Sequence, residues 1–263
     1  DDAFMFYGIA SGKVSSDHIE FVHVIEDIQS LNERALKGEL EVSAVSAHAY
    51  LKVQNNYKIL SCGASMGEGY GPIVVTRGDL NHIKGKRIGV PGKLTTAFLL
   101  LGIYSDGFTP VEIPFDDIME SVIEGDVDAG LLIHEGQLTY KDYGLKCILD
   151  LGEMWAKDTS LPMPLGLNVV KRGFDEDIEK EVLRIHQESI GYGLNNKDEA
   201  LDYALQFGRG MERNLGEKFV LMYVNDVTKN MGDEGRRALD YLYSRAFERG
   251  LITEKAKLDI LFN

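Results

Sequence analysis

Short apolar blocks alternate with amphipathic blocks along the first two thirds of the chain. Between Asp27 and Gly38, apolar residues recur at spacings of three and four, which predicts a helix that Asp27 caps and Gly38 ends. Apolar or alternating runs predict strands at residues 18–24, 42–46, 57–65, 73–76, 86–90, 111–114, 129–133, 145–151 and 167–170. Further helices are expected at 1–11, 93–104 and 115–122. Strands that alternate with helices in this way predict an α/β fold.

The pattern changes in the last third of the chain. Helical periodicity replaces the strands and predicts helices at 178–195, 198–207, 212–224 and 234–249. We therefore expect a two-lobed α/β protein with a helical C-terminal segment. The large lobe is expected at 1–76 plus 170–263 and the small lobe at 77–169, with a cleft between them. The glycine-rich segment at 67–72 suits a flexible crossing between the lobes.

The same helix–turn–strand pattern occurs twice along the chain, and we refer to it as the turn device. At Gly38 and again at Gly125, a helix is expected to end on glycine, an acid–aliphatic–acid turn follows, and a buried strand begins. The first copy leads to Ser46 and the second to His134. A chance recurrence of a common turn is the alternative interpretation for so short a pattern. If the device is shared, each lobe uses it to place one polar side chain at a strand end.

His134 directly follows the apolar run at 129–133. In open α/β sheets, ligands bind just beyond the carboxyl ends of strands, so a histidine at this point suits a catalytic group. A histidine that only caps the strand end by hydrogen bonding is the competing interpretation. From this position alone, the two interpretations carry equal weight.

Thr95 and Thr96 lie at the expected start of a helix. The N–H groups of a first helical turn have no partner inside the helix, and the dipole there favours a carboxylate or a phosphate. Two threonines that cap their own helix are the alternative. A nucleotide-binding P-loop is not expected, because Arg87 and Leu94 stand where the motif needs Gly and Ser or Thr.

Residues 63–67 match the G-x-S-x-G pattern of a nucleophile elbow. An elbow needs a helix directly after its serine, whereas Ser65 is followed by further glycines, Pro72 and a strand. We therefore reject Ser65 as a nucleophile.

The net charge and the residue composition limit which kinds of partner and cofactor the chain can have. The chain of 263 residues has a formal net charge of −14, so it lacks the basic surface that nucleic acid or an anionic membrane needs. Its two cysteines, Cys62 and Cys147, indicate buried thiols in a reducing cytoplasm rather than disulfides. No run approaches the length of a membrane span, and no export signal is visible, although the sequence begins at Asp1 rather than Met. The histidines show no metal-ligand spacing, so no metal and no cofactor is expected.

Four segments together carry a resemblance to a known family. They resemble MqnD, the 1,4-dihydroxy-6-naphthoate synthase family of the futalosine route to menaquinone. The His-Glu-Gly run at 134–136 is the most specific part, and the similarity extends from the first residue to at least Asn168. The four segments are Ile133–Tyr140, Gly67–Pro72, Glu26–Asn32 and Asp1–Phe4.

The resemblance implies the two-lobed fold of type II periplasmic solute-binding proteins, with the ligand in the cleft between lobes. It also implies a lyase that splits cyclic dehypoxanthinyl futalosine into 1,4-dihydroxy-6-naphthoate and a three-carbon ketose fragment. His134 matches the family's proton acceptor. The matching substrate-contact segments are Ala44, Val45 and Ser46, and Thr96 with Ala97. The implied partner is an anionic small molecule in the cytoplasm; the resemblance implies nothing about the oligomeric state.

Two departures from the family pattern leave other functions open. The family's Asn-Asp-Thr-Phe stands here as Asp1-Asp2-Ala3-Phe4, and a lysine is common where this chain has Ala44. The exact substrate is therefore open to a related activity of the pathway, such as chorismate dehydratase. A non-catalytic solute-binding protein for an anionic ligand is the alternative from another class.

Overall fold

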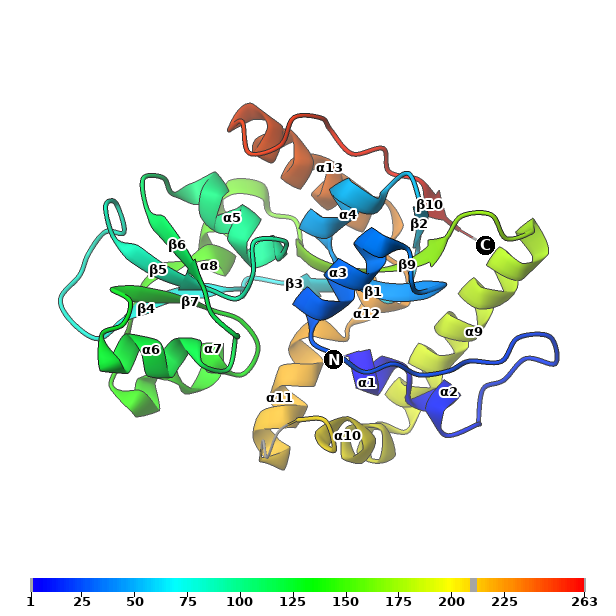
Figure 1. The fold of residues 1–263 in the computed structure, drawn as a ribbon. Coiled ribbons are helices and arrows are strands. Elements are labelled where there is room, and N and C mark those ends of the chain that lie inside the picture. The colour runs from blue at the N-terminus through cyan, green and yellow to red at the C-terminus, as the bar shows by residue number, and fades with distance from the viewer. Residues whose placement is uncertain (1, 209–211, 263) are drawn as a thin grey trace. The chain divides into compact units, whose positions relative to one another are not determined.

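The computed structural model describes residues 2–208 and 212–262. The chain divides into two compact units. Unit 1 comprises Asp1–Met66, Gly166–Arg236 and Ala256–Asn263, and unit 2 comprises Gly67–Leu165 and Arg237–Lys255. The chain therefore passes between the units several times, and each unit holds a sheet of its own (Figure 1).

The sheet of unit 1 is mainly antiparallel. Its strands follow the order β1-β9-β2-β10, and β3 also pairs with β9. β9 is antiparallel to both β1 and β2, with Val42 opposite Val170 and Tyr57 opposite Lys171, whereas β10 is parallel to β2. The strands are β1 (Val42–Ser46), β2 (Tyr57–Leu60), β3 (Ser65–Gly67), β9 (Met163–Lys171) and β10 (Ile260–Leu261).

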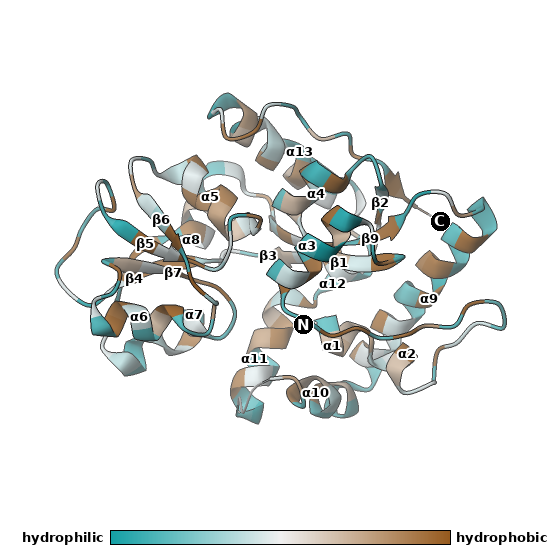
Figure 2. Ribbon diagram, in the orientation of Figure 1, coloured by the Kyte–Doolittle hydropathy of each residue, from teal (hydrophilic) through white to brown (hydrophobic). Residues whose placement is uncertain are grey.

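Helices cover the sheet of unit 1. The buried core includes Phe4 and Met5 of the first helix, Leu60 of β2, and Val182 and Leu183 of α9. Residues of opposite hydropathy alternate along α9, as expected for a helix with one buried face (Figure 2). The helices are α1 (Asp2–Met5), α2 (Tyr7–Ala10), α3 (Ile28–Lys37), α4 (Ala47–Val53), α9 (Glu176–Asn195), α10 (Lys197–Leu205), α11 (Arg213–Tyr223) and α12 (Asp226–Lys229).

The sheet of unit 2 has a parallel half. Its order is β6-β5-β7-β4-β8, in which β5 is parallel to both β6 and β7, while β4 is antiparallel to β7 and β8. The strands are β4 (Ile73–Thr76), β5 (Arg87–Val90), β6 (Thr109–Glu112), β7 (Ala129–Leu132) and β8 (Lys146–Asp150). Helices flank this sheet on both faces (Figure 1): α5 (Thr96–Tyr104), α6 (Ile118–Glu124), α7 (Gly136–Thr139) and α8 (Leu151–Thr159). α13 (Gly232–Glu248) begins in unit 1 and continues in unit 2.

The predicted α/β organisation and several element ends are confirmed. The Asp27 side chain accepts hydrogen bonds from the N–H groups of Gln29 and Ser30, and it caps α3 as predicted. Gly38 and Gly125 end α3 and α6 in the left-handed region, with φ of 68° and 87°. β1 spans the predicted residues, and the four C-terminal helices appear with small shifts at their ends. Both copies of the turn device therefore exist.

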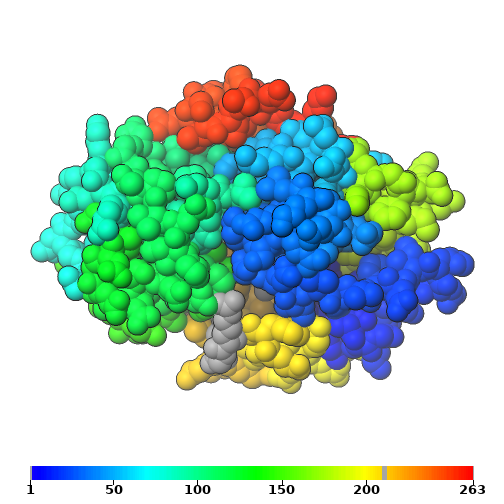
Figure 3. Space-filling view, in the orientation of Figure 1, coloured from blue at the N-terminus to red at the C-terminus, as the bar shows by residue number. Residues whose placement is uncertain are grey.

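Three predicted strands are wrong in whole or in part. The run at 57–65 is two strands, β2 and β3, because Gly63 between them takes a left-handed φ of 78°. The strand predicted at 111–114 lies at 109–112 instead. Residues 18–24, predicted as a strand, form none, because the chain pairs them with no neighbouring strand within the part that the structure describes. This amino-terminal segment lies on the surface (Figure 3).

No helix in the described ranges 2–208 and 212–262 is long and apolar enough to cross a membrane. Cys62 is buried and Cys147 half-buried, and both are free thiols. Burial raises the pKa of Cys62 to about 12 and that of Cys147 to about 11, so both thiols stay protonated at neutral pH. Neither sulfur is therefore activated as a nucleophile.

Candidate active site

Three parallel strands of unit 2 end at the same edge of their sheet. Because β6 and β7 are each parallel to β5, the segments that follow β5, β6 and β7 leave the sheet at one end. These segments carry Thr95 and Thr96 after β5, Phe115 after β6 and His134 after β7. In open α/β sheets this edge is where ligands bind. The sheet topology thus brings the predicted His134 and Thr96 to one edge.

His134 is held in an unusual backbone conformation. Its φ is +56°, in the left-handed region that residues other than Gly, Asn and Asp seldom adopt. The residue is half-buried, and α7 begins two positions later at Gly136. Its backbone carbonyl accepts a hydrogen bond from the N–H of Gln137 at 3.3 Å. Strained backbone of this kind costs on the order of 1–3 kcal/mol and clusters at functional sites.

Phe115 fixes one side of the His134 ring. The two ring centroids are 4.7 Å apart and the planes meet at 62°, an edge-to-face contact. Phe115 is half-buried in the loop after β6. The contact orients the imidazole without using either ring nitrogen.

Thr139 is hydrogen-bonded to Glu135, the residue that directly follows His134. The Thr139 hydroxyl donates to the backbone carbonyl of Glu135 at 3.3 Å, as does the Thr139 N–H at 3.2 Å. These bonds close the first turn of α7 behind the histidine. Thr139 therefore supports the loop that carries His134 through the Glu135 backbone.

Thr95 and Thr96 have different roles at the start of α5. Thr95 is the N-cap: its hydroxyl accepts from the N–H of Phe98 at 3.3 Å and donates to the carbonyl of Gly92 at 2.7 Å. Thr96 is the first helical residue, and its hydroxyl donates to the carbonyl of Leu165 at 2.6 Å. A hydroxyl has one proton to donate. The helix start can therefore offer an anion its backbone N–H groups, among them that of Ala97, rather than the Thr96 hydroxyl.

A lysine and a glutamate sit at the same edge. Lys93 Nζ lies 2.9 Å from Glu112 Oε2, and the Lys93 N–H donates to Oε1 of the same carboxylate. The hydrogen bond from Lys93 lowers the pKa of Glu112, so the pair is charged and nearly neutral in sum at pH 7. Both groups are about half exposed, and such pairs add little to stability.

In unit 1, Ser46 makes two hydrogen bonds to a buried asparagine. Asn32 is completely buried on α3; its Nδ2 donates to Ser46 Oγ at 3.0 Å, and its Oδ1 accepts from the Ser46 N–H at 2.8 Å. Ser46 ends β1 and stands at the N-cap position of α4, but its side chain does not cap that helix. Because the hydroxyl accepts from Asn32, its own proton is left to donate elsewhere.

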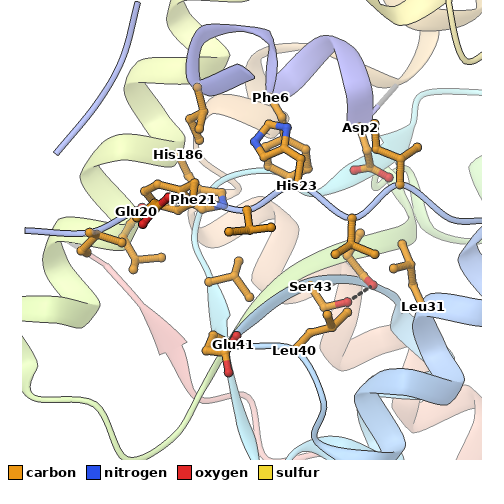
Figure 4. A pocket seen from close by; sticks show the side chains of 18 of the residues that line it. Asp2, Phe6, Glu20, Phe21, His23, Leu31, Leu40, Glu41, Ser43 and His186 are labelled. Carbon is orange, nitrogen blue, oxygen red and sulfur yellow. Dashed lines mark hydrogen bonds between the residues drawn. The ribbon is translucent and has the colours of Figure 1, made fainter. Parts of the chain in front are cut away.

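Ala44 and Val45 precede Ser46 on β1. Val45 is fully buried, whereas Ala44 is partly exposed. Ala44 lines a pocket of about 580 Å³ inside unit 1 (Figure 4). The structure therefore brings Ala44, Val45 and Ser46 together on one strand, and Thr96, Ala97 and His134 together at one edge of the other sheet. In the described ranges, no cluster of three or more His, Cys, Asp or Glu side chains has the arrangement of a metal site.

Comparison with known proteins settles the family. Residues 1–248 match the family model described as menaquinone biosynthesis. A curated relative from Thermus thermophilus, named 1,4-dihydroxy-6-naphthoate synthase, is 39% identical over 251 residues, which cover 95% of this chain and 92% of the relative. The chain belongs to the menaquinone biosynthesis family.

Solved structures show which fold this chain shares. A crystal structure of a protein from Archaeoglobus fulgidus is 50% identical, with a TM-score of 0.92 and coverage of 95% of this chain and 94% of that chain. A protein of Candida albicans described as having the generic periplasmic-binding-protein fold is 14% identical, with a TM-score of 0.71 and coverage of 99% and 92%. The second likeness shows the fold alone: this member of the menaquinone biosynthesis family has a periplasmic-binding-protein-like fold.

Two residues at the site escaped the sequence analysis. Asn32 lies within the segment Glu26–Asn32 that carried the family resemblance, and it is a polar residue beside the apolar stripe of α3. That position was the available signal. Phe115 falls within the helix predicted at 115–122, but α6 begins at Ile118 and Phe115 is in the preceding loop. No local pattern indicated its contact with His134, because the two residues meet only through the strand order.

Proposed function

We propose that the chain is a 1,4-dihydroxy-6-naphthoate synthase, a carbon–carbon lyase of menaquinone biosynthesis, in which His134 is the general base. Family membership and the name of the Thermus relative support the reaction class. The observation that carries the role of His134 is its position: a left-handed residue directly beyond a buried parallel strand, with its ring set against Phe115. The proposed substrate is cyclic dehypoxanthinyl futalosine.

The proposed step is a retro-aldol cleavage. The His134 imidazole takes the proton of a substrate hydroxyl, the oxygen becomes a carbonyl, and the adjacent carbon–carbon bond breaks. Its electron pair moves into the part of the substrate that becomes the aromatic naphthoate, which takes the proton back from His134, and the three-carbon fragment leaves as a ketose. Imidazole is the side chain that most often serves as a general base in enzymes. The chemistry needs no metal or cofactor.

Substrate contacts are proposed for the remaining predicted residues. The anionic group of the substrate would accept from backbone N–H groups at Thr96 and Ala97, which begin α5. The Ser46 hydroxyl, oriented by Asn32, would donate a further hydrogen bond, with Ala44 and Val45 supplying the backbone beside it. Hydrogen bonds to a charged group contribute about 1.5–3 kcal/mol each. The cleft between lobes and the cytoplasmic location remain predictions.

The experiment follows product formation. Purified protein is incubated with cyclic dehypoxanthinyl futalosine, and the naphthoate is detected by its absorbance. Asn tolerates the left-handed region, so His134→Asn removes the base with little backbone strain, and His82→Asn, at an exposed site, is the matched control. We expect His134→Asn to lower turnover by about 10²–10⁴-fold with little change in affinity.

The other functions predict other outcomes of the same experiment. Tight binding without turnover by the unmodified protein would favour the solute-binding protein. Turnover of chorismate, but not of the futalosine derivative, would favour the related dehydratase activity. Near-normal turnover by His134→Asn would leave the reaction in place but remove His134 from it.

A further inference from the structure

Phe115 lies between two residues of the core of unit 2 without belonging to that core. Ile113 and Ile118, on either side of it in the chain, pack in the apolar cluster around Val122. Within the described residues, this cluster does not include Phe115, which is half-buried and contacts the His134 ring. Phenylalanine normally stabilises a protein by burying its ring among apolar side chains. A ring that lies against an imidazole instead indicates a role at the proposed site.

Both ends of the loop that carries Phe115 are held in place. The Ile113 N–H donates to the Val90 carbonyl at 3.0 Å and extends the pairing of β6 with β5. The Asp117 N–H donates to the Pro114 carbonyl at 2.9 Å and closes a turn around Phe115. Proline fixes its own φ, so this turn has few alternative conformations. The loop therefore gives the Phe115 ring a defined position.

Two glycines seat this loop on the strand that leads to His134. A Cβ on Gly89 of β5 would lie 3.2 Å from Ile113 Cδ1. A Cβ on Gly130 of β7 would lie 2.5 Å from Ile118 Cγ2. Gly89 and Gly130 are direct partners across the two strands and form one depression, as glycines in strands do where another group approaches closely. Because His134 follows β7, this depression fixes how the loop lies against the histidine.

We propose that Phe115 is a positioning residue of the reaction, which holds the His134 imidazole in the rotamer that takes the substrate proton. This role rests on the proposed function, in which His134 is the general base. The left-handed backbone directs the Cβ of His134, but the ring beyond it can still rotate about χ1 and χ2. Centroids 4.7 Å apart with planes at 62° form a favourable edge-to-face pair, which favours one rotamer by roughly two- to tenfold.

The rotamer of His134 matters because proton transfer depends on distance. A general base must lie within hydrogen-bond reach of the proton that it accepts, and a displacement of about 1 Å can lower the rate about 10²-fold. Phe115 carries no acid or base, so it acts on the reaction only through His134. Its loss should therefore lower kcat and leave the binding of the substrate almost unchanged.

The kinetic test removes the Phe115 ring and keeps an apolar side chain. Phe115→Leu and Phe115→Met are compared with the unmodified protein in the turnover of cyclic dehypoxanthinyl futalosine. We expect kcat to fall by about tenfold and KM to change by less than about twofold. Phe115→Tyr keeps the ring and should retain kcat within about twofold.

Phe108 provides a matched control at the opposite end of β6. It is also a half-buried phenylalanine between regular elements of unit 2, and its ring makes an edge-to-face contact with Phe98 at 6.4 Å between centroids. Phe108→Leu removes an aromatic pair of the same kind and should leave kcat unchanged.

Proton NMR tests the contact without turnover. The His134 ring protons are assigned by their absence from the spectrum of His134→Asn, and the Phe115 ring shifts their resonances because an aromatic ring alters the local magnetic field. Phe115→Leu should move these resonances toward those of the exposed His82, whereas Phe108→Leu should leave them in place.

Normal kcat in Phe115→Leu and Phe115→Met would overturn the inference and leave the proposed reaction standing. So would His134 resonances that do not move in Phe115→Leu. A rise in KM as large as the fall in kcat would make Phe115 a substrate contact and would overturn the inference as well. No turnover by the unmodified protein would overturn the proposed function, and the inference with it.

Discussion

The side chain of Asn32 makes two hydrogen bonds to Ser46, one to its hydroxyl and one to its backbone N–H. The pair is buried, and it joins the middle of α3 to the end of β1. An amide is the side chain that can donate to one atom and accept from its neighbour at once. A structural residue on a helix therefore sets the direction in which a proposed substrate donor points.

Asn32→Leu should destabilise the protein and disturb Ser46. The change leaves the Ser46 N–H without its buried acceptor, which costs about 1–3 kcal/mol of unfolding free energy. Chemical denaturation measures the loss, and Leu36→Gln on the exposed side of the same helix is the control, expected within about 0.5 kcal/mol of the parent. A loss no greater than that of the control would mean that the pair contributes nothing.

Two substitutions of His134 should lower activity equally but lower stability by different amounts. At a φ of +56°, Asn is tolerated better than Ala, so His134→Ala should be less stable than His134→Asn by about 1 kcal/mol although both lack the base. Thermal unfolding and product formation are measured on the same samples. Equal stability of the two variants would show that the loop relaxes and stores no strain.

Thr96→Val should act on stability more than on binding. The hydroxyl donates to the part-buried carbonyl of Leu165, so its loss should lower the unfolding free energy by about 1–3 kcal/mol. The backbone N–H groups remain, and affinity for a carboxylate substrate should change less than about tenfold. Thr96→Ser keeps the hydroxyl and serves as the control. A large loss of affinity at unchanged stability would contradict the assignment.

Two glycines with nearly the same backbone angle should respond differently to alanine. Gly63 has φ of +78° and Gly69 has +76°, but a Cβ on Gly63 would clash with Nδ2 of Asn168, whereas a Cβ on Gly69 would have no atom of the described residues within 4 Å. Gly69→Ala should therefore cost only the left-handed strain of about 1–2 kcal/mol. Gly63→Ala should cost several kcal/mol more in denaturation experiments. Equal losses would mean that Asn168 moves aside easily.

Acid should destabilise unit 1 through His186. Burial lowers the pKa of this histidine to about 4, and its Nδ1 donates to the Val182 carbonyl at 2.8 Å. Between about pH 6.5 and 4 the unfolded chain binds a proton that the native state does not, so stability falls as pH falls, by about 3 kcal/mol in total. His186→Asn should flatten this part of the pH profile, and His82→Asn should not. An unchanged profile in His186→Asn would assign the acid sensitivity to other groups.

Local signals in the sequence predicted the elements that local chemistry determines. Asp27 caps α3 because its own side chain reaches the next backbone N–H groups, and Gly38 ends it because glycine accepts a positive φ. The position of His134 at a strand end was also predictable, because the apolar run at 129–133 directly precedes it. The sequence did not reveal its left-handed φ, since histidine does not favour that region.

Non-local pairing accounts for what the sequence analysis missed. Residues 18–24 have the period of a strand, but a strand exists only with a partner, and periodicity says nothing about the partner. The break at Gly63 depends on Asn168, more than one hundred positions away in the chain. The contact between Phe115 and His134 depends on the order of β5, β6 and β7. Each of these relationships appears only when the topology is known.

Residues 19–26 make no backbone hydrogen bond within the part of the chain that the structure describes, and this bears on how the protein resists proteases in a cell extract. Proteases bind their substrates as extended chains and cut where the backbone is exposed and not held by a ladder. This segment meets both conditions, and Val22 at its centre is 80% exposed. The first cut should therefore fall there and release a peptide that contains α1 and α2. Phe4 and Met5 of the buried core lie on that peptide, so a cut there should lower the stability of unit 1.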